Sequence, residues 1–405
     1  MKTLEDEQST ITDDRSKMSF PKEIIEDILS RLPVKSIVRF KSVSKPWLSL
    51  ISAPSFHNLH SAVGSRTTAL FFSAFDSSTG TRYFFSGAND GGSVANLMKL
   101  DNIVSNFAHK FAEHLNGLVC FTSRTSRRFG TIYAFIFNPS THKFLKLPDP
   151  PVSLPNYTTA EEKDTCYLFG FDELTNEHKV LYIDVELIKP TTIEIMIFSL
   201  SNYSWRKINV DLPVGVSARR WWFGTKNSVC VNSTIHLLLR NPLQILAFNL
   251  TTEMFSIINM HPEAAPKTIL TKSLCPDAQF VKINGLLGVA CYDRWIVDGR
   301  NKMDIWMLQD YQNQVWVRET IWLASKSWIN YMAGEPYPFD SINMDEIIFS
   351  PRVLSDNLIS VPIYNMKSRC SKSIELPLGH RFLSPKSVSV EEIKCYVESL
   401  IPLQN

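Results

Sequence analysis

A short β unit recurs along this chain, and its spacing limits the possible folds more than any other feature. Each copy consists of apolar strands joined by a turn, a short polar link, and a closing strand with an aromatic residue. Four copies align, at residues 136–148, 197–208, 247–258 and 305–321. Their closing aromatic residues follow one another at intervals of 61, 50 and 61 positions: Phe144, Trp205, Phe255 and Trp316. One such unit cannot bury both faces of its sheet, so neighbouring units must stack.

The region from about Thr67 onward is rich in strand signals. Short runs of Phe, Ile, Val, Tyr and Trp alternate there with turn clusters of Gly, Asn, Asp and Pro. The intervals lie near the ~50-residue period of kelch-like propeller blades, and a closed ring leaves few free sheet edges. We therefore favour a propeller-like domain over 67–402, with a β-sandwich of irregular hairpins as the alternative. The tail at 387–402 has mixed periodicity, which leaves open a last strand that closes the ring or a short helix.

Residues 20–56 show a different pattern, in which three groups of apolar residues follow helical spacing. These apolar residues are too many for so small a core, since a lone unit of this size rarely supplies more than ~3–5 kcal/mol of stability. Ser44 is expected to cap the third helix and to place Pro46 in its first turn. We predict a three-helix docking module at 19–60, and an α+β chain because a large all-β domain follows.

Composition sets the compartment and excludes some classes of protein. The 405-residue chain has room for both domains, and its net charge of +2 gives no sign of polyanion binding. Residues 1–18 lack an apolar centre, so we expect a disordered lead and not a signal peptide. Seven scattered cysteines without a CxxC motif indicate the reducing cytosol or nucleus. No apolar run is long enough to predict a membrane span.

The helical segment resembles the F-box. The resemblance rests on residues at fixed spacing: Pro21, Glu23, Ile24, Ile28, Leu29, Arg31, Leu32, Pro33, Val34, Lys35, Ser36, Arg39, Phe40, Lys41, Val43, Lys45 and Trp47. The chain departs from the family's usual residues at Phe20, Pro46 and Leu48. The resemblance implies an interface with a Skp-type linker protein formed by Phe20, Pro21, Ile24, Ile28, Leu32, Pro33, Val34, Val43 and Trp47. Other apolar residues form the module's own core, and the sequence alone does not separate the two sets.

The β region is similar to the plant F-box-associated domain, a kelch-related module, in its type-three branch. The matching residues are Asn116 to Leu118, Asn138 to Ser140, Gly170 to Asp172, Lys179, Val180, Ser204 to Arg206, and Asp304 to Trp306. The double-glycine mark of kelch repeats is absent. Together the two resemblances cover residues 20 to about 365.

Motifs that carry catalytic chemistry are missing from the sequence. Neither a G-x-S-x-G elbow nor a phosphate-binding loop occurs. Cys120 and Cys291 lie in strand-like runs and are expected to be core thiols and not nucleophiles. The only histidines at helical spacing are His57 and His60, which we assign to a solvated linker because further metal ligands are missing nearby. We expect no catalytic residue, metal or cofactor.

Two basic clusters are candidates for target binding, because Arg and Trp are enriched in protein-binding hot spots. The first cluster lies in the segment 122–130 and the second in 213–224, where arginines precede aromatic residues. The alternatives are solvated loop arginines beside core aromatics, which we rank first, and nucleic-acid binding, which we rank last. The candidate residues are Arg124, Arg127, Arg128, Arg219, Arg220 and Trp221.

By resemblance, the chain is expected to be a substrate-recruiting adaptor of a Skp–cullin–F-box ubiquitin ligase. It would bind a Skp-type linker, and through it a cullin, and would present an unidentified target protein without binding nucleic acid or membrane. One alternative is an interaction protein that binds the linker but delivers no target. The other is a propeller-fold enzyme, which predicts a central channel rich in ionisable groups.

Overall fold

The computed structural model divides into two compact units, Met1–Ser65 and Arg66–Asn405. The residues that it describes are 20–63, 68–101, 110–124, 132–151, 163–186, 192–213, 216, 228–239, 244–264, 278–297, 300–323, 338–342, 345–349, 352–353, 358–379, 382 and 387–403. The expected disordered lead, 1–18, lies outside these ranges.

Residues 20–63, the described part of the first unit, form four helices: α1 (Lys22–Ser30), α2 (Val34–Phe40), α3 (Lys45–Ser52) and α4 (Pro54–Val63). The sequence predicted only three of them. The fourth helix contacts α1 and α3 and buries Phe56 and His60, so it completes a core that three helices would leave open. The assignment of His57 and His60 to a solvated linker was wrong. Their Nε2 atoms lie 2.9 Å from Ile51 O and 3.1 Å from Leu32 O, so both histidines tie α4 to the rest of the unit.

The start of α3 follows the predicted capping arrangement. Ser44 has an extended backbone, and its hydroxyl accepts a hydrogen bond from the backbone N–H of Trp47 at 3.3 Å. Pro46 lies in the first turn, where its missing N–H removes no intrahelical hydrogen bond. The proline is therefore compatible with the helix.

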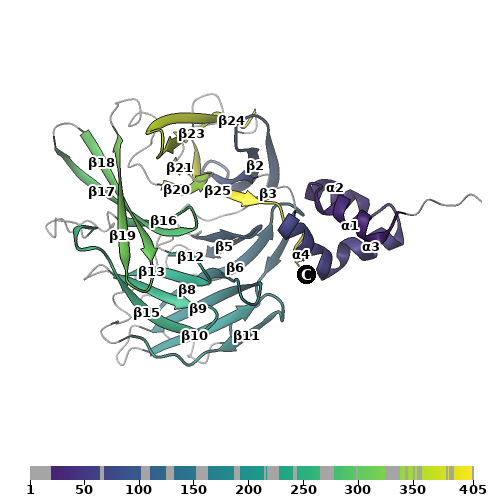
Figure 1. Ribbon diagram of the computed structural model, residues 1–405, viewed down its shortest axis with the longest axis horizontal. Helices are drawn as coiled ribbons and strands as arrows, with labels where there is room; N and C mark the ends of the chain where they lie inside the picture. The colour runs from purple at the N-terminus through teal and green to yellow at the C-terminus, as the bar shows by residue number, and fades with distance from the viewer. Residues whose placement is uncertain are drawn as a thin grey trace, which may run out of the picture. The chain divides into compact units, whose positions relative to one another are not determined.

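The second unit is built from six antiparallel sheets (Figure 1). The first three blades contain β1 (Thr68–Asp76), β2 (Thr81–Ala88) and β3 (Val94–Leu100) with β25 (Val388–Val397); then β4 (Lys110–Leu115), β5 (Leu118–Arg124), β6 (Ile132–Asn138) and β7 (Lys143–Lys146); then β8 (Lys163–Asp172), β9 (Glu177–Glu186), β10 (Thr192–Ser199) and β11 (Ser204–Lys207).

The other three blades contain β12 (Ser228–Val231), β13 (Thr234–Leu239), β14 (Gln244–Asn249) and β15 (Met254–Asn259); then β16 (Ala278–Ile283), β17 (Leu286–Val297), β18 (Arg300–Asp310) and β19 (Val315–Leu323); then β20 (Pro338–Ile342), β21 (Glu346–Phe349), β22 (Arg352–Val353), β23 (Leu358–Asn365) and β24 (Cys370–Pro377). A short 3₁₀ turn, η2 (Pro262–Ala264), follows β15.

The sheets form a six-bladed propeller and not a sandwich. The strands β4, β8, β12, β16, β20 and β25 contact one another in ring order, so they are the innermost strands of their blades. The tail that the sequence left undecided is β25, which pairs with β1 from Thr68 to Asp76. The last strand of the chain therefore completes the first blade and closes the ring, as the yellow β25 in Figure 1 shows.

The predicted repeat matches the blades. The four closing aromatics lie on β7, β11, β15 and β19, which are outermost strands. A residue with positive φ precedes each closing strand, four positions after the end of the third strand, and a fifth blade has the same turn: His142, Tyr203, Glu253, Gln314 and Arg369. Side chains stabilise these turns, because Asn138 Oδ1 accepts from the backbone N–H of Ser140 (2.9 Å) and Asn249 Oδ1 from that of Thr251 (2.9 Å).

The antiparallel order separates the connections onto two faces of the propeller. Turns from the first to the second strand of a blade, and from the third to the fourth, emerge on one face and are tight, as between β4 and β5. Connections from the second to the third strand, and from one blade to the next, emerge on the opposite face. We call this second face the long-connection face, because it receives the segments between β7 and β8, β11 and β12, and β15 and β16.

Candidate functional site

The α1 helix displays a stripe of exposed apolar side chains. Phe20, Ile24 and Ile28 are 64%, 45% and 52% exposed. Ile24 and Ile28 are four residues apart and lie on one side of α1, and Phe20 precedes the helix, which begins at Lys22. Exposed apolar side chains gathered in this way form a candidate contact surface for a partner.

The other residues of the expected linker interface divide into surface and core. Pro21, Pro33 and Val43 are exposed, while Leu32 and Trp47 are half-buried. The Trp47 ring packs edge-on against Phe40, with 5.2 Å between the ring centroids.

Val34, which was expected to lie on the linker interface, lies in the core of the helical unit instead. Its side chain is 0% exposed and belongs to the unit's own core together with Leu29, Ile37 and Ile51. It therefore presents no surface to a partner. Val38 and Leu48, which the sequence did not assign to the interface, are 41% and 46% exposed.

The candidate target-binding residues can be placed only in part. Arg124 is the last residue of β5, and the other five, Arg127, Arg128, Arg219, Arg220 and Trp221, lie outside the described residues. The ends of β5 and β11 both open onto the long-connection face. The strands that flank the two basic clusters therefore end on the same side of the propeller.

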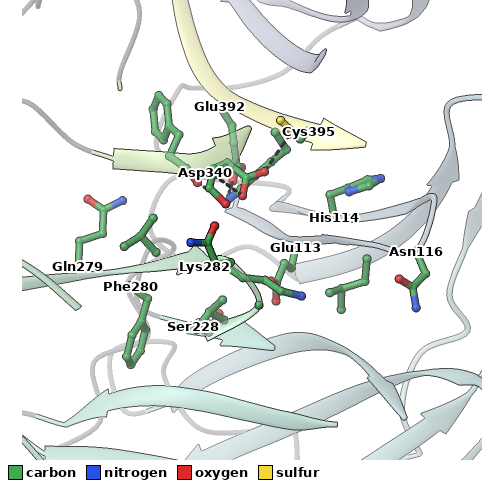
Figure 2. Close-up of a pocket in the computed structure, with 18 of the residues that line it drawn as sticks. Glu113, His114, Asn116, Ser228, Gln279, Phe280, Lys282, Asp340, Glu392 and Cys395 are labelled. Atoms are coloured by element: carbon green, nitrogen blue, oxygen red, sulfur yellow. Dashed lines mark hydrogen bonds and ion pairs between the residues drawn. The ribbon is translucent and has the colours of Figure 1, made fainter. Parts of the chain in front are cut away.

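A cavity of about 430 Å³ lies among the innermost strands (Figure 2). Its wall includes residues of β4, β12, β16, β20 and β25, and it reaches the tight turn at Asn284 and Gly285. Figure 2 shows Glu113, Lys282 and Asp340, from three different blades, gathered around this space. We call it the channel cavity.

One side of the channel cavity holds a compact set of paired charges. Asp340 accepts hydrogen bonds from the backbone N–H groups of Ser341 (3.0 Å) and Cys395 (2.8 Å). The Lys394 ammonium donates to Phe339 O at 2.6 Å and lies 3.6 Å from a Glu392 carboxylate oxygen. Burial raises the pKa of Asp340, and the nearby Lys394 opposes that rise.

The opposite side carries Glu113 and Lys282, and His114, next to Glu113 on β4, lies nearer to β25 (Figure 2). Burial raises the pKa of the Glu113 carboxyl to about 8, although Lys282 and Lys394 act to lower it. Glu113 Oε2 accepts from the backbone N–H of Cys230 at 2.5 Å. Burial lowers the pKa of His114 to about 3, so its imidazole is neutral near pH 7. This channel is rich in ionisable groups, which is what the propeller-enzyme alternative predicts, yet the lining alone does not define a reaction.

Cys120 is a core thiol as expected, whereas Cys291 is only partly buried. Cys120 is fully buried, and burial raises the pKa of its thiol. Burial also raises the pKa of Cys395, and it raises that of Cys230 to about 12. A raised pKa disfavours the reactive thiolate. Within the described ranges, no group of His, Cys, Asp or Glu residues has a geometry that could hold a metal ion. The same residues contain no helix long and apolar enough to cross a membrane.

The residues of the channel cavity were not identified by the sequence analysis. Its charged residues come from separate blades, so no local motif joins them. The sequence contains one weak signal for them. Each charged residue interrupts an innermost strand that is otherwise rich in β-forming residues, such as KFAEHL before Asn116 and AQFVKI before Asn284. Only the ring closure brings these strands together.

Two family models match the sequence. The F-box associated beta propeller domain matches residues 63–389, and the F-box domain matches residues 18–59. The first match covers most of the chain and coincides with the six-bladed unit. The chain belongs to the F-box associated beta propeller family.

The chain is similar to curated proteins that are named as F-box proteins. The Arabidopsis thaliana F-box protein At1g30790 is 27% identical over 361 residues, which cover 83% of each chain. The F-box protein DOR of Arabidopsis thaliana is 24% identical over 383 residues, or 91% of each chain. The chain therefore matches these F-box proteins over nearly their whole length.

Solved structures with a similar fold are more distant. The nidogen/laminin complex has a TM-score of 0.43 at 9% identity, over 82% of this chain and 99% of that chain. The periplasmic gluconolactonase PpgL of Pseudomonas aeruginosa has a TM-score of 0.40 at 9% identity, with the same coverage. Because both TM-scores lie below 0.5, neither structure bears on function.

Several residues that carried the resemblance to the F-box-associated domain join parts of the propeller to one another. The Asn138 amide nitrogen donates to Ser399 O (3.0 Å) and to Ile401 O (2.9 Å), so it fastens the end of the chain to the second blade. The Trp205 indole donates to Pro148 O at 2.7 Å and links the second blade to the third. These residues therefore hold neighbouring parts of the ring together.

Proposed function

We propose that this chain is the substrate-recruiting adaptor of a Skp–cullin–F-box ubiquitin ligase. The helical unit docks on a Skp-type linker protein and through it on a cullin. The propeller holds the target protein. The observation that carries the proposal is the exposed stripe of Phe20, Ile24 and Ile28 on a unit that matches the F-box model.

The proposed mechanism involves no covalent step by this chain. Tethering two binding events on one scaffold raises the effective concentration of target lysines near a ubiquitin-charged enzyme. The six described cysteines form no disulfide and suit the reducing cytosol or nucleus, where we place the protein. The long-connection face is the proposed target surface, because binding residues concentrate on long connections that a rigid scaffold positions.

Linker docking can be tested with the full-length chain and a purified Skp-type protein. We expect the double substitution Ile24→Ala with Ile28→Ala to weaken binding by at least about 2 kcal/mol, or roughly thirtyfold, because it removes the two exposed apolar side chains that α1 contributes to the stripe. Leu174→Ala is the matched control, since Leu174 is 78% exposed but belongs to the propeller. Binding that survives the double substitution unchanged would contradict the assignment.

Target delivery needs a separate experiment in cells. The Ile24→Ala, Ile28→Ala chain should keep a folded propeller but no longer bind the linker protein. We therefore expect it to bind target proteins without bringing them to the ligase. Proteins captured by this variant should be ubiquitinated less than those captured by the native chain under proteasome inhibition. A captured partner whose lifetime does not change when the native chain is lost would favour the non-degradative alternative.

A further inference from the structure

The channel cavity has the properties of a small-molecule site. Its volume of about 430 Å³ falls within the ~300–1,000 Å³ of typical ligand pockets. Apolar residues such as Val229 and Phe280 share its wall with amide side chains such as Gln279. Pockets of this kind combine an apolar body with a few polar groups that fix the ligand's orientation.

The internal pairing of the charges decides which ligand chemistry fits. Asp340 is occupied by two backbone N–H groups, and Lys394 by Phe339 O and Glu392. These groups therefore offer little unused bonding capacity to a ligand.

Three other groups that line the cavity retain unused hydrogen-bonding capacity. Among the described residues, the Lys282 ammonium makes no hydrogen bond or ion pair. The buried Nε2 of His114 likewise has no partner within the described part of the chain. Glu113 uses one oxygen to accept from Cys230, and with its raised pKa the carboxyl carries a proton at neutral pH, so it can donate to a ligand.

We propose that the channel cavity binds a small organic acid whose carboxylate is held between the Lys282 ammonium and the Glu113 carboxyl. The lysine supplies the charge that a carboxylate needs in a partly buried site. The protonated Glu113 supplies a neutral donor on the other side and avoids repulsion between two carboxylates. Such a site would give the propeller a ligand of its own, separate from linker docking by the helical unit and from any target on the long-connection face.

The proposal can be tested by calorimetric titration of the purified full-length chain. The probes are benzoate and succinate, each paired with its neutral amide, with sodium sulfate at matched ionic strength as a third arm. We expect at least one carboxylate to bind, and its amide and sulfate to bind at least about tenfold more weakly. Failure of both carboxylates to bind, or equal binding of sulfate, would overturn the proposal.

Substitutions at Lys282 locate the binding to the cavity. Lys282→Met should weaken binding of the carboxylate by at least tenfold, and Lys282→Arg should restore most of it because the positive charge returns. Lys372→Met is the matched control, since Lys372 lies on β24 and is 57% exposed. An unchanged thermal melting curve of the Lys282→Met chain shows that lost binding does not reflect lost folding. Binding that persists in a folded Lys282→Met chain would overturn the assignment, and linker binding serves as an independent readout that should not change.

Discussion

The ammonium of Lys179 lies 2.7 Å from Asp172 Oδ2, and the two side chains are only 9% and 0% exposed. Thr251 donates to the other carboxylate oxygen at 2.7 Å, and Lys179 also donates to Leu250 O at 3.1 Å. The pair therefore joins the third blade to the fourth. Although burial alone would raise the pKa of Asp172, the hydrogen bonds from Lys179 and Thr251 hold it at about 2.

Removing the cation from this pair should weaken the propeller strongly. Lys179→Met leaves the buried Asp172 carboxylate without its counter-ion, so we expect a loss of about 3–5 kcal/mol in the free energy of unfolding. Urea unfolding followed by tryptophan fluorescence measures the loss. Lys99→Met removes a pair with Asp101 whose side chains are 59% and 52% exposed, and it should cost less than about 1 kcal/mol. Equal losses in the two variants would contradict the role assigned to Lys179.

The blades that the sequence predicted are those whose signals are local. The turn residue and the aromatic of each closing strand are close in sequence, as Tyr203 and Trp205 are, so the pattern near Trp205 or Trp316 is visible without a structure. The last blade was missed because its closing strand, β24, carries the aliphatic residues Ile374 and Leu376 at its buried positions and no aromatic. The first blade was missed because Thr68 pairs with Val397, and a partner more than three hundred residues away leaves no periodic trace.

The helical unit shows the same limit at the level of single residues. Helical spacing identified which positions are apolar, but Val34 and Val38 share that property and differ completely in burial. Which of them faces the core depends on how α2 packs against α3, and helical spacing alone does not determine that packing. The channel cavity is the extreme case, because its residues become neighbours only when the ring closes.

The turn at Gly117 should tolerate no side chain. Gly117 has φ of 84°, and a Cβ built there would lie 2.1 Å from the Cβ of Ser399. Gly117→Ala therefore combines backbone strain with displacement of the end of the chain, and we expect a loss of about 3 kcal/mol or more, measured by thermal unfolding. Gly285 occupies the equivalent turn of another blade, with φ of 76° and no described atom within 4 Å of its added Cβ. Gly285→Ala should cost only the strain of about 1–2 kcal/mol, and an equally large loss there would refute the clash with Ser399.

Buried histidines should make the propeller sensitive to acid. Burial lowers the pKa of His178 to about 4, although its Nε2 bonds to Leu115 O at 2.9 Å, and burial lowers that of His236 to about 4 as well. Between about pH 6.5 and pH 4 the unfolded chain binds protons that the folded chain does not, so acid favours unfolding in this window. Each such histidine adds a slope of at most about 1.4 kcal/mol per pH unit.

The contribution of His178 can be isolated by His178→Gln. The glutamine amide can still donate to Leu115 O but takes up no proton, so the decline in stability from pH 6.5 to 4 should become shallower. Urea midpoints measured across this range give the slope for each chain. Above pH 7, histidine is neutral in both the folded and the unfolded chain. The dependence of stability on pH should therefore differ little between the native and substituted chains there. An identical acid slope in both chains would show that His178 does not titrate on unfolding.

Two valines of the helical unit separate the core from the docking surface. Val34 is 0% exposed and Val43 is 60% exposed, so the same substitution should have opposite effects. Val34→Ala removes two buried methyl groups and should cost about 2 kcal/mol of stability, seen as faster hydrogen exchange in α1 to α4, with linker affinity kept within about threefold. Val43→Ala should leave hydrogen exchange unchanged but lower the affinity for the linker protein, measured by calorimetry, because the Val43 side chain lies on the proposed interface. The division between core and interface would be wrong if Val34→Ala lowered the affinity for the linker protein more than Val43→Ala while both variants kept the same hydrogen-exchange protection in α1 to α4.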